Sequence, residues 1–381
     1  MPEFPHKLQQ KIEKRIENAS LRALSIPKNN IDFSSNDYLG YSKSKELFEA
    51  VHQFLVERDV FQNGVAGSRL LTGNHLLYQE TEDFISTFHK SETALIFNSG
   101  YDANVGLFSS MPQRGDLILY DEYCHASIRD GIQLSNAKSY KFIHNDLEDL
   151  KALLEKYSSS DSLLYVVTES VFSMDGDSPD LEQMALLVEK YGAYFIVDEA
   201  HALGVFGNNG EGLIQHLNLQ EKIFARIMTF GKGLGCHGAA VLGSKQVKEY
   251  LVNFSRSFIY TTGLPPHSVA SILLAYQFLS KEKQALENLR ENISYFNQEK
   301  QLLGLKQLFV RNKSAIQSAI LPGNEKVKGI AAKLQENGFD VKAILSPTIP
   351  EGQERLRFCL HSYTTKQEIS QVLQLLSSSL F

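Results

Sequence analysis

Short apolar runs alternate with amphipathic stretches between about residues 90 and 245. The runs, rich in Val, Ile and Leu, are TALIF (93–97), DLILYD (116–121), LLYVVTE (163–169), AYFIVDEAH (193–201), FARIMTF (224–230) and GAAVLG (238–243). Two of the segments between them, 146–157 and 180–191, repeat their apolar residues at helical spacing. Apolar strands separated by helices are typical of a mostly parallel sheet that is covered on both faces. The pattern therefore predicts a doubly wound α/β domain.

The flanking segments follow other patterns. Residues 7–24 place Leu8, Ile12 and Ile16 at four-residue intervals, which predicts a helix. After Pro265–Pro266 we predict a long helix to about residue 300, then a strand at 314–321, a helix at 325–337, strands at 339–345 and 355–361, and a terminal helix. The predicted parts are an N-terminal helix and arm (1–45), a large α/β domain (46–270) and a small C-terminal α+β domain (271–381).

Composition and charge narrow the class of protein. The 381 residues carry 38 basic and 44 acidic side chains, and this net charge of −6 argues against a nucleic-acid binder, which normally has a basic face. The three cysteines form no C-x-x-C pair, so we expect neither a metal centre nor a disulfide framework. No apolar run approaches the ~20 residues of a membrane span, and residues 1–20 lack the apolar centre of a signal peptide. We expect a cytoplasmic enzyme without a membrane or nucleic-acid partner.

The tetrapeptide Asp198-Glu199-Ala200-His201 spells DEAH, a motif that is also found in helicases. A helicase requires a phosphate-binding loop of the form G-x-x-x-x-G-K-[ST]. The nearest match, at 229–233, has Gly233 directly after Lys232 and no glycine at the required upstream position. The missing loop and the acidic net charge argue against a helicase.

Two polar segments directly follow apolar runs. Asn98-Ser99-Gly100-Tyr101 comes after TALIF and precedes a predicted helix at 102–110. A small turn that leads into a helix exposes backbone N–H groups that suit a phosphate, although an ordinary turn has the same sequence features. Asp198 ends the run AYFIV, where a carboxylate can keep a cofactor's ring nitrogen protonated, and His201 can reach the same ligand. A helix cap or a surface acid is the alternative for Asp198.

Two further residues occupy loops after strands. Lys232 lies between Gly231 and Gly233, which leave its amine room to reach a ligand, and a desolvated lysine forms Schiff bases. His125 follows DLILYD, where its ring can lie flat on an aromatic cofactor. Considered alone, each residue could be an ordinary loop lysine or a structural histidine. Because ligands in such folds bind at the carboxyl edge of the sheet, the features together predict a pyridoxal 5'-phosphate site.

At these residues the chain resembles the α-oxoamine synthases, which are fold-type I enzymes that use pyridoxal phosphate. The resemblance extends along nearly the whole chain. The segments that carry it are FSSNDYLG (33–40), GSRLLTGN (67–74), SGYDAN (99–104), HASIRDG (125–131), TESVFSMDGD (168–177), VDEAHALGVFG (197–207), TFGKGLG (229–235), YTTGLPP (260–266) and SAIQ (314–317). The resemblance implies a large domain with a mostly parallel central sheet and a small C-terminal α+β domain.

The resemblance implies roles for the residues that match. Lys232 is expected to bind the cofactor covalently and to move protons at the α-carbon of the substrate. Asp198 is expected to pair with the ring nitrogen, and His125 to stack on the ring. Ser173 and His201 are expected near the ring oxygen.

Other matching residues are expected to hold the phosphate or the substrate. Contacts to the phosphate are implied for Ser99, Gly100, Tyr101 and Thr229. Thr262 is implied to reach the phosphate of a neighbouring subunit, which requires a homodimer with shared active sites. Contacts to the substrate are implied for Arg22, Asn36 and Glu169.

The implied reaction is a decarboxylative condensation of an amino acid with an acyl thioester. Within the family, the resemblance is to the branch that joins L-alanine to pimeloyl-CoA or a pimeloyl carrier protein and forms 8-amino-7-oxononanoate for biotin. Glycine C-acetyltransferase, serine palmitoyltransferase and 5-aminolevulinate synthase share the cofactor constellation and stay open as alternatives. A non-catalytic subunit of this fold is a further alternative, against which the presence of Lys232 argues.

The sequence departs from the family pattern at one position. The family usually has an arginine for the substrate carboxylate in the segment that reads KAILSPT (342–348) here, and the matching residue is Leu345. Arg355, Arg357 and Lys342 are the candidates to replace it. Residues two apart in a strand share a face, so both arginines can point the same way. We favour Arg357, because it lies deeper in the strand-like run RLRFCLH.

Overall fold

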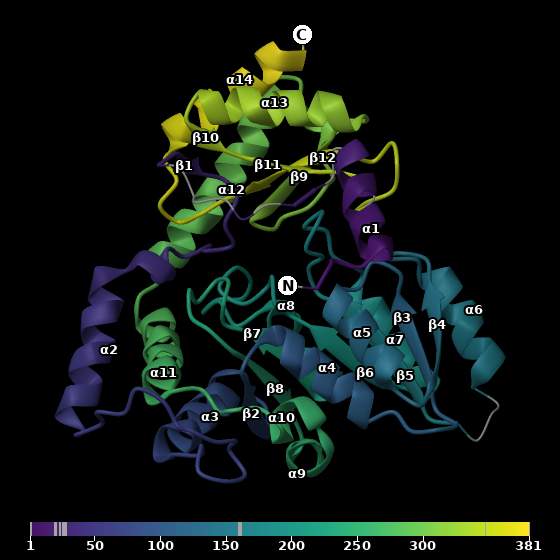
Figure 1. Cartoon of the computed structure of the whole chain (residues 1–381), viewed down its shortest axis with the longest axis vertical. Helices are drawn as coiled ribbons and strands as arrows, with labels where there is room; N and C mark the ends of the chain where they lie inside the picture. Colours follow the sequence, from purple (N-terminus) through teal and green to yellow (C-terminus); the bar gives the residue numbers. More distant parts are fainter. Residues whose placement is uncertain are drawn as a thin grey trace.

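A seven-stranded sheet forms the centre of the molecule (Figure 1). The computed structural model describes residues 2–18, 21–22, 24, 29–158, 162–346 and 348–380. In spatial order the strands are β2 (Thr93–Phe97), β8 (Ala239–Gly243), β7 (Ala225–Thr229), β6 (Tyr194–Asp198), β5 (Leu164–Glu169), β3 (Leu117–Asp121) and β4 (Lys138–Phe142). Strand β8 runs antiparallel to β2 and β7, and the other pairings are parallel. The prediction of a mostly parallel sheet is confirmed.

Helices cover both faces of this sheet. Successive strand residues point to opposite sides, and the apolar residues on each side pack against helices. On β3, Ile118 packs into the core on one face, whereas Leu117 and Leu119 pack into the core on the other. The first face is covered by α4 (Gly100–Ser110), α5 (Ala126–Leu134), α9 (Lys245–Phe254) and α10 (Arg256–Ile259). The second face is covered by α2 (Lys45–Glu57), α3 (Leu76–Phe88), α6 (Leu147–Tyr157), α7 (Leu181–Lys190), α8 (Leu213–His216) and α11 (Pro266–Lys281).

A second, smaller sheet lies above the first in Figure 1. It is antiparallel, and its strands in order are β11 (Lys342–Ile344), β12 (Arg355–Cys359) and β9 (Ile316–Ile320). The helices beside it are α12 (Gln284–Leu302), α13 (Asn324–Glu336) and α14 (Lys366–Leu380). The N-terminal strand β1 (Ile31–Asp32) pairs in parallel with β10 (Phe339–Asp340), so the segment before residue 45 joins this part of the molecule. The boundaries at residues 45 and 270 stay a prediction.

After residue 45 the structure differs from the sequence predictions in three places. The long helix after Pro266 is two helices, α11 and α12, because Glu282 is extended and the chain turns from the large sheet towards the small one. The strand predicted at 339–345 is split into β10 and β11. Strand β4 was not predicted, because four of its five residues are exposed at the sheet edge and carry no apolar pattern.

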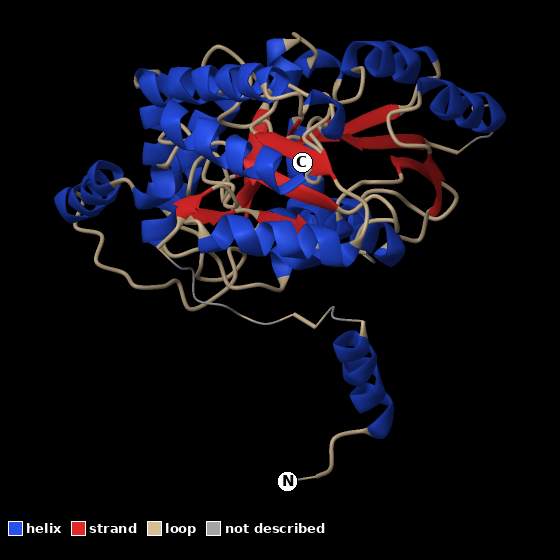
Figure 2. Ribbon diagram, turned by 90° about the horizontal axis from the view of Figure 1, so that it is seen from above, coloured by secondary structure: helices blue, strands red, loops and turns tan. Residues whose placement is uncertain are grey.

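The N-terminal helix α1 spans His6–Glu17 and has no buried residue. It ends before the predicted limit at residue 24, and residues 19, 20 and 23 of that prediction lie outside the described residues. Figure 2 shows α1 beside the main body of the molecule, not packed within it. Throughout the part of the chain that the structure describes, no helix is long and apolar enough to cross a membrane.

Candidate active site

The predicted site residues follow the carboxyl ends of β2, β3, β5, β6 and β7, which lie at one edge of the large sheet. In the register of β5 and β6, Glu169 and Asp198 are direct partners. Two buried carboxyl groups therefore lie side by side at this edge, since both side chains are less than a tenth exposed. Such an edge is where α/β folds bind ligands.

The N-terminus of α4 lies against the end of β7. Ser99 caps the helix, because its Oγ accepts the N–H of Asp102 at 3.0 Å. The N–H groups of Gly100 and Tyr101 come before the first intrahelical bond and have no protein acceptor among the described residues. A Cβ at Gly100 would lie 2.5 Å from Oγ1 of Thr229, so only glycine allows this close approach. The four residues predicted to hold a phosphate are thus together.

Asp198 is held by two hydrogen-bond donors. Its Oδ1 accepts the backbone N–H of Ala200 at 2.8 Å, and its Oδ2 accepts Nδ2 of Asn104 at 2.8 Å. Nδ2 of Asn104 also donates to Oγ of Ser127 at 3.1 Å, which fixes the amide. These two donors fix the orientation of the Asp198 side chain before any ligand binds.

The other acid of the DEAH motif has a structural role. Glu199 is fully buried, and its Oε2 accepts Nε and Nη2 of Arg226 at 2.9 and 2.6 Å. Its Oε1 accepts the N–H groups of Leu213 and Ile214, which open α8. Glu199 therefore ties strand β7 to α8 and does not face the site.

Lys232 lies on the loop after β7, in a position that depends on its glycine neighbour. A Cβ at Gly233 would lie 2.3 Å from the carbonyl oxygen of Leu203, so this loop can pack against residue 203 only with glycine there. Burial lowers the pKa of Lys232, while the nearby charge of Asp198 opposes that shift. The amine is thus more easily deprotonated than that of an exposed lysine, as a nucleophilic or proton-accepting lysine requires.

Glu169 connects the two neighbouring loops. Its Oε1 accepts the backbone N–H of His125 at 2.5 Å. Burial and the adjacent charge of Asp198 raise the pKa of Glu169 to about 8, so this carboxyl group holds a proton at neutral pH. The ring of His125 is fixed from the other side, where its Nδ1 lies 2.7 Å from Oγ of Ser127. Both residues predicted at this point of the site are therefore present and oriented.

His201 is buried against Tyr38, whose hydroxyl lies 2.7 Å from its Nδ1. Burial and the charge of Lys232 lower the pKa of His201 well below its usual value, so the ring is neutral. The Tyr38 hydroxyl also lies 3.2 Å from Oδ1 of Asn36, and we assign its proton to Nδ1 of His201 because that contact is the shorter one. The remaining N–H of His201, on Nε2, is then free to donate to a ligand oxygen.

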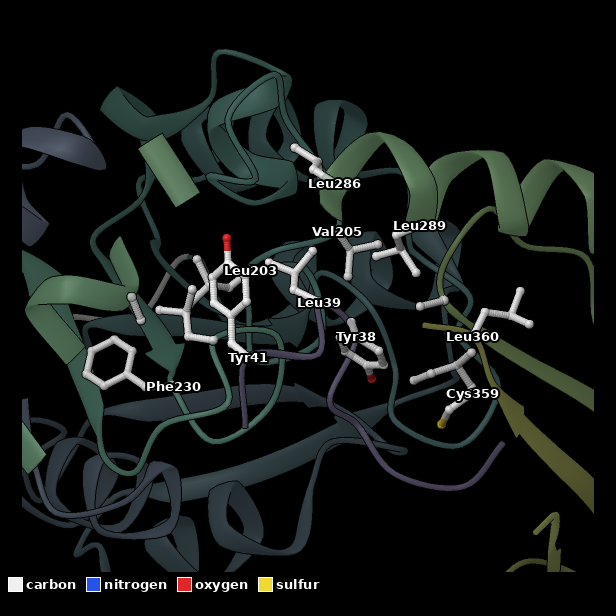
Figure 3. Close-up of a cluster of buried hydrophobic side chains, with 14 of the residues drawn as sticks. Tyr38, Leu39, Tyr41, Leu203, Val205, Phe230, Leu286, Leu289, Cys359 and Leu360 are labelled. Atoms are coloured by element: carbon white, nitrogen blue, oxygen red, sulfur yellow. The ribbon is translucent and has the colours of Figure 1, made fainter. Parts of the chain in front are cut away.

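The segment that carries Tyr38 lies between the two sheets. Figure 3 shows Tyr38 and Leu39 with Leu203 and Val205 of the large part and with Cys359 and Leu360 at the end of β12. Tyr38 is fully buried in this cluster. The dry cluster fixes the hydroxyl that orients His201, and it joins the N-terminal segment to both parts of the molecule.

The structure distinguishes between the candidate cations. Leu345, at the position where an arginine was expected, packs against the hydrophobic core. Nζ of Lys342 donates to Asp340 at 2.9 Å, so Lys342 is already paired with a carboxylate of the protein. Arg355 is ion-paired with Asp175. Arg357 donates to the carbonyl of Ser173 at 2.8 Å and to Asn36, and its charge lowers the pKa of Lys232 and His201. Arg357 is thus the cation that faces the lysine.

Two predicted residues stand apart from this group. The carbonyl of Thr262 accepts Nδ2 of Asn98 at 2.7 Å, and the side chain of Thr262 is exposed. Arg22 is exposed and contacts no other predicted site residue within the described part of the chain. The roles predicted for both residues stay predictions. Ser173, by contrast, lines a cavity together with His125, and its predicted role near the ring stays a prediction.

Sequence reasoning missed two residues that hold the site together, Asn104 and Tyr38. An asparagine at a buried position of α4, among Ala103, Gly106 and Leu107, was an available signal, because buried polar groups need a partner. Tyr38 carried no such signal, since a tyrosine in a turn-rich segment is common, and its contact with His201 spans 163 residues.

Comparisons with known proteins extend over the whole chain. Residues 28–376 match the family model described as aminotransferase class I and II. An 8-amino-7-oxononanoate synthase of Emericella nidulans is 40% identical over an alignment of 396 positions, which covers 97% of this chain and 94% of that protein. The crystal structure of 8-amino-7-oxononanoate synthase from Francisella tularensis superposes with a TM-score of 0.79 at 32% identity, covering 92% of this chain and 98% of that one. A serine palmitoyltransferase of S. paucimobilis with bound pyridoxal phosphate and myriocin gives 0.88 at 27% identity, covering 98% and 96%.

Proposed function

Because this chain belongs to the aminotransferase class I and II family and is similar to 8-amino-7-oxononanoate synthases over nearly its whole length, we propose that it condenses L-alanine with a pimeloyl thioester. The products are 8-amino-7-oxononanoate, carbon dioxide and the free thiol, and the reaction is a step of biotin synthesis. The observation that carries the proposal is the convergence of Lys232, Asp198 and Arg357 at one sheet edge.

The site fits pyridoxal phosphate, whose ring accepts the charge that develops at the substrate α-carbon. The exposed N–H groups at the start of α4 and the hydroxyl of Thr229 would hold the phosphate. Asp198, whose side chain is oriented by two donors, would keep the ring nitrogen protonated. His125 would cover the ring face, and the Nε2–H of His201 would donate to the ring oxygen.

Lys232 would form the covalent bond to the cofactor and move the proton at the α-carbon. Its lowered pKa increases the fraction of neutral amine, which both steps need. Glu169, protonated at neutral pH, adds no second negative charge beside Asp198. The charge of Asp198 is thus left for the ring nitrogen.

We propose that Arg357 binds the carboxylate of the amino acid and replaces the arginine that the family usually has at the position of Leu345. Arg357 is mostly buried and fixed by Ser173 and Asn36, so its guanidinium is oriented before substrate arrives. A planar, preorganised fork can bind a carboxylate through two hydrogen bonds. Substrate roles for Asn36 and Glu169 are part of the same proposal, and Arg22 is proposed as a contact from the N-terminal segment.

We propose further that the active form is a homodimer in which Thr262 reaches the partner's cofactor. Large apolar side chains are exposed on the loop before α3, at the first residue of α3 and on the segment after α10, namely Phe61, Leu71, Leu76 and Tyr260. The N–H of Gly263 binds the carbonyl of Gly67 at 3.0 Å, so these two segments adjoin. Adjoining exposed apolar residues are typical of an interface. Active monomers in sedimentation and activity measurements at low concentration would contradict the dimer.

The proposed reaction is tested by offering the purified holoenzyme L-alanine, glycine or L-serine with acetyl-, pimeloyl- or palmitoyl-CoA. Mass spectrometry identifies each product. We expect the pair of L-alanine and pimeloyl-CoA to give the highest kcat/KM. A preference for glycine with acetyl-CoA, or for L-serine with palmitoyl-CoA, would move the chain to another branch of the family. A protein that binds the cofactor and forms no product would be a non-catalytic subunit.

A further inference from the structure

A cavity of about 250 Å³ lies beside the proposed reaction centre, next to His125 and Ser173. Its walls are largely apolar, with Tyr123, Phe172 and Ile349 among them. The volume holds roughly eight groups of the size of a water molecule, at about 30 Å³ each. A seven-carbon acyl group matches this space, whereas a sixteen-carbon chain would have to extend beyond it.

Four charged side chains line the cavity, and three of them are neutralised by neighbours. Asp175 and Arg355 form an ion pair with each other. Glu122 lies 3.4 Å from Nζ of Lys141. The side chain of Arg129 has no ion pair or hydrogen bond to any residue that the structure describes. The cavity therefore has one uncompensated positive charge.

The positive charge of Arg129 lies on the same side of the molecule as His125. Arg129 lies on α5 four residues after His125, and residues at this spacing share a helix face. Burial lowers the pKa of His125, and Arg129 contributes to the shift through its positive charge. The next residue, Asp130, accepts the hydroxyl of Tyr101 at 2.6 Å and does not neutralise Arg129.

We propose that Arg129 binds the terminal carboxylate of the acyl thioester, so that this chain selects a dicarboxylic acyl donor over a plain fatty acyl donor. The inference rests on the proposed function, since pimeloyl thioesters end in a carboxylate. Arg129 is exposed at the rim of the cavity, so the carboxylate keeps part of its hydration while it binds. A guanidinium matches a carboxylate in charge and geometry. The apolar walls then contact the methylene chain.

The test compares pimeloyl-CoA with octanoyl-CoA, which has no terminal charge, in wild type and Arg129→Gln. We expect the kcat/KM ratio of pimeloyl to octanoyl donor to fall about ten-fold or more in the variant, as for the loss of one charge-assisted hydrogen bond. Arg129→Lys should restore part of the ratio. The matched control is Arg114→Gln, which removes the same charge from an exposed loop before β3, at the opposite end of that strand from His125. It should keep the wild-type ratio.

The outcomes separate this inference from the proposed function. An unchanged ratio in Arg129→Gln, or an equal loss for both donors, would overturn the role of Arg129 while the wild type still makes 8-amino-7-oxononanoate. A wild type that prefers a shorter dicarboxylic thioester, such as succinyl-CoA, with the ratio still dependent on Arg129, would contradict the proposed product and support the subsite. A wild type that prefers octanoyl-CoA would overturn both.

Discussion

Replacement of Asp198 by asparagine tests the proposed partner of the ring nitrogen. It separates the effect of a lost hydrogen bond on stability from the effect of a lost charge on turnover. The carboxylate accepts two N–H donors, from Ala200 and from Asn104, each at 2.8 Å. An asparagine has one oxygen and one NH₂ group, so one of these buried donors would face another donor. The loss of one buried hydrogen bond costs about 1–3 kcal/mol. Without cofactor, the free energy of unfolding of Asp198→Asn should therefore be lower than that of the wild type by about that amount.

The loss of charge has a larger effect on turnover than on stability. An amide cannot keep the ring nitrogen protonated, and removal of one preorganised electrostatic group lowers kcat about 10²–10³-fold, or ~2.7–4 kcal/mol. We expect Asp198→Asn to bind pyridoxal phosphate, seen as absorbance that copurifies with the protein, and to lose turnover on this scale. Steady-state kinetics with L-alanine and pimeloyl-CoA measures the loss.

Asp116→Asn provides the control for turnover. Asp116 is also a buried carboxylate that accepts a backbone N–H, from Gln113 at 2.8 Å, but it lies before β3 at the opposite edge of the sheet. We expect near wild-type turnover and a smaller loss of stability than for Asp198→Asn, because the oxygen of an asparagine can keep this one donor. If Asp198→Asn turned over within about three-fold of wild type, well short of the effect of one electrostatic group, Asp198 would not be the partner of the ring nitrogen.

Three further predictions follow from the same geometry. Arg357→Ala should raise the KM for L-alanine about ten- to hundred-fold, with a much smaller change in the KM for the thioester, and equal changes in both would refute a specific role in binding the carboxylate. Borohydride reduction of the wild type should fix the cofactor to the peptide that contains Lys232, and Lys232→Ala should stay folded without covalent attachment; a label on another lysine would refute the assignment. Burial alone would lower the pKa of His144, but its bonds to Asp121 and Asp177 raise it to about 9. The stability it contributes is therefore complete below about pH 6.5 and is lost as the pH rises through 9, so urea unfolding of wild type and His144→Gln should converge over that range.

The local sequence was sufficient to place the main chemical groups. Asp198 and Lys232 directly follow apolar runs that became β6 and β7, and Ser99 directly follows the run that became β2. Because parallel strands end at one edge, the order of runs and turns predicted which residues would meet. Gly100 and Gly233 were also readable, since a glycine beside a site residue indicates a close approach of the backbone.

Contacts between distant segments were not readable from the sequence. Arg355 and Arg357 lie on the same strand face, and Asp175, 180 residues away from Arg355, forms an ion pair with Arg355 and not with Arg357. Arg357 has only uncharged hydrogen-bond partners among the described residues. Local pattern also gave no break at Glu282, because no glycine or proline marks the point where α11 ends. The path of the chain between the two sheets sets that break.

The most direct test of the central claim uses L-alanine labelled with ¹³C in its carboxyl group, together with pimeloyl-CoA and the purified holoenzyme. Mass spectrometry follows the gas and the organic product in the same reaction. We expect one labelled carbon dioxide for each molecule of 8-amino-7-oxononanoate, and no label in the product. Label retained in the organic product, or release of free CoA without formation of a new carbon–carbon bond, would contradict a decarboxylative condensation.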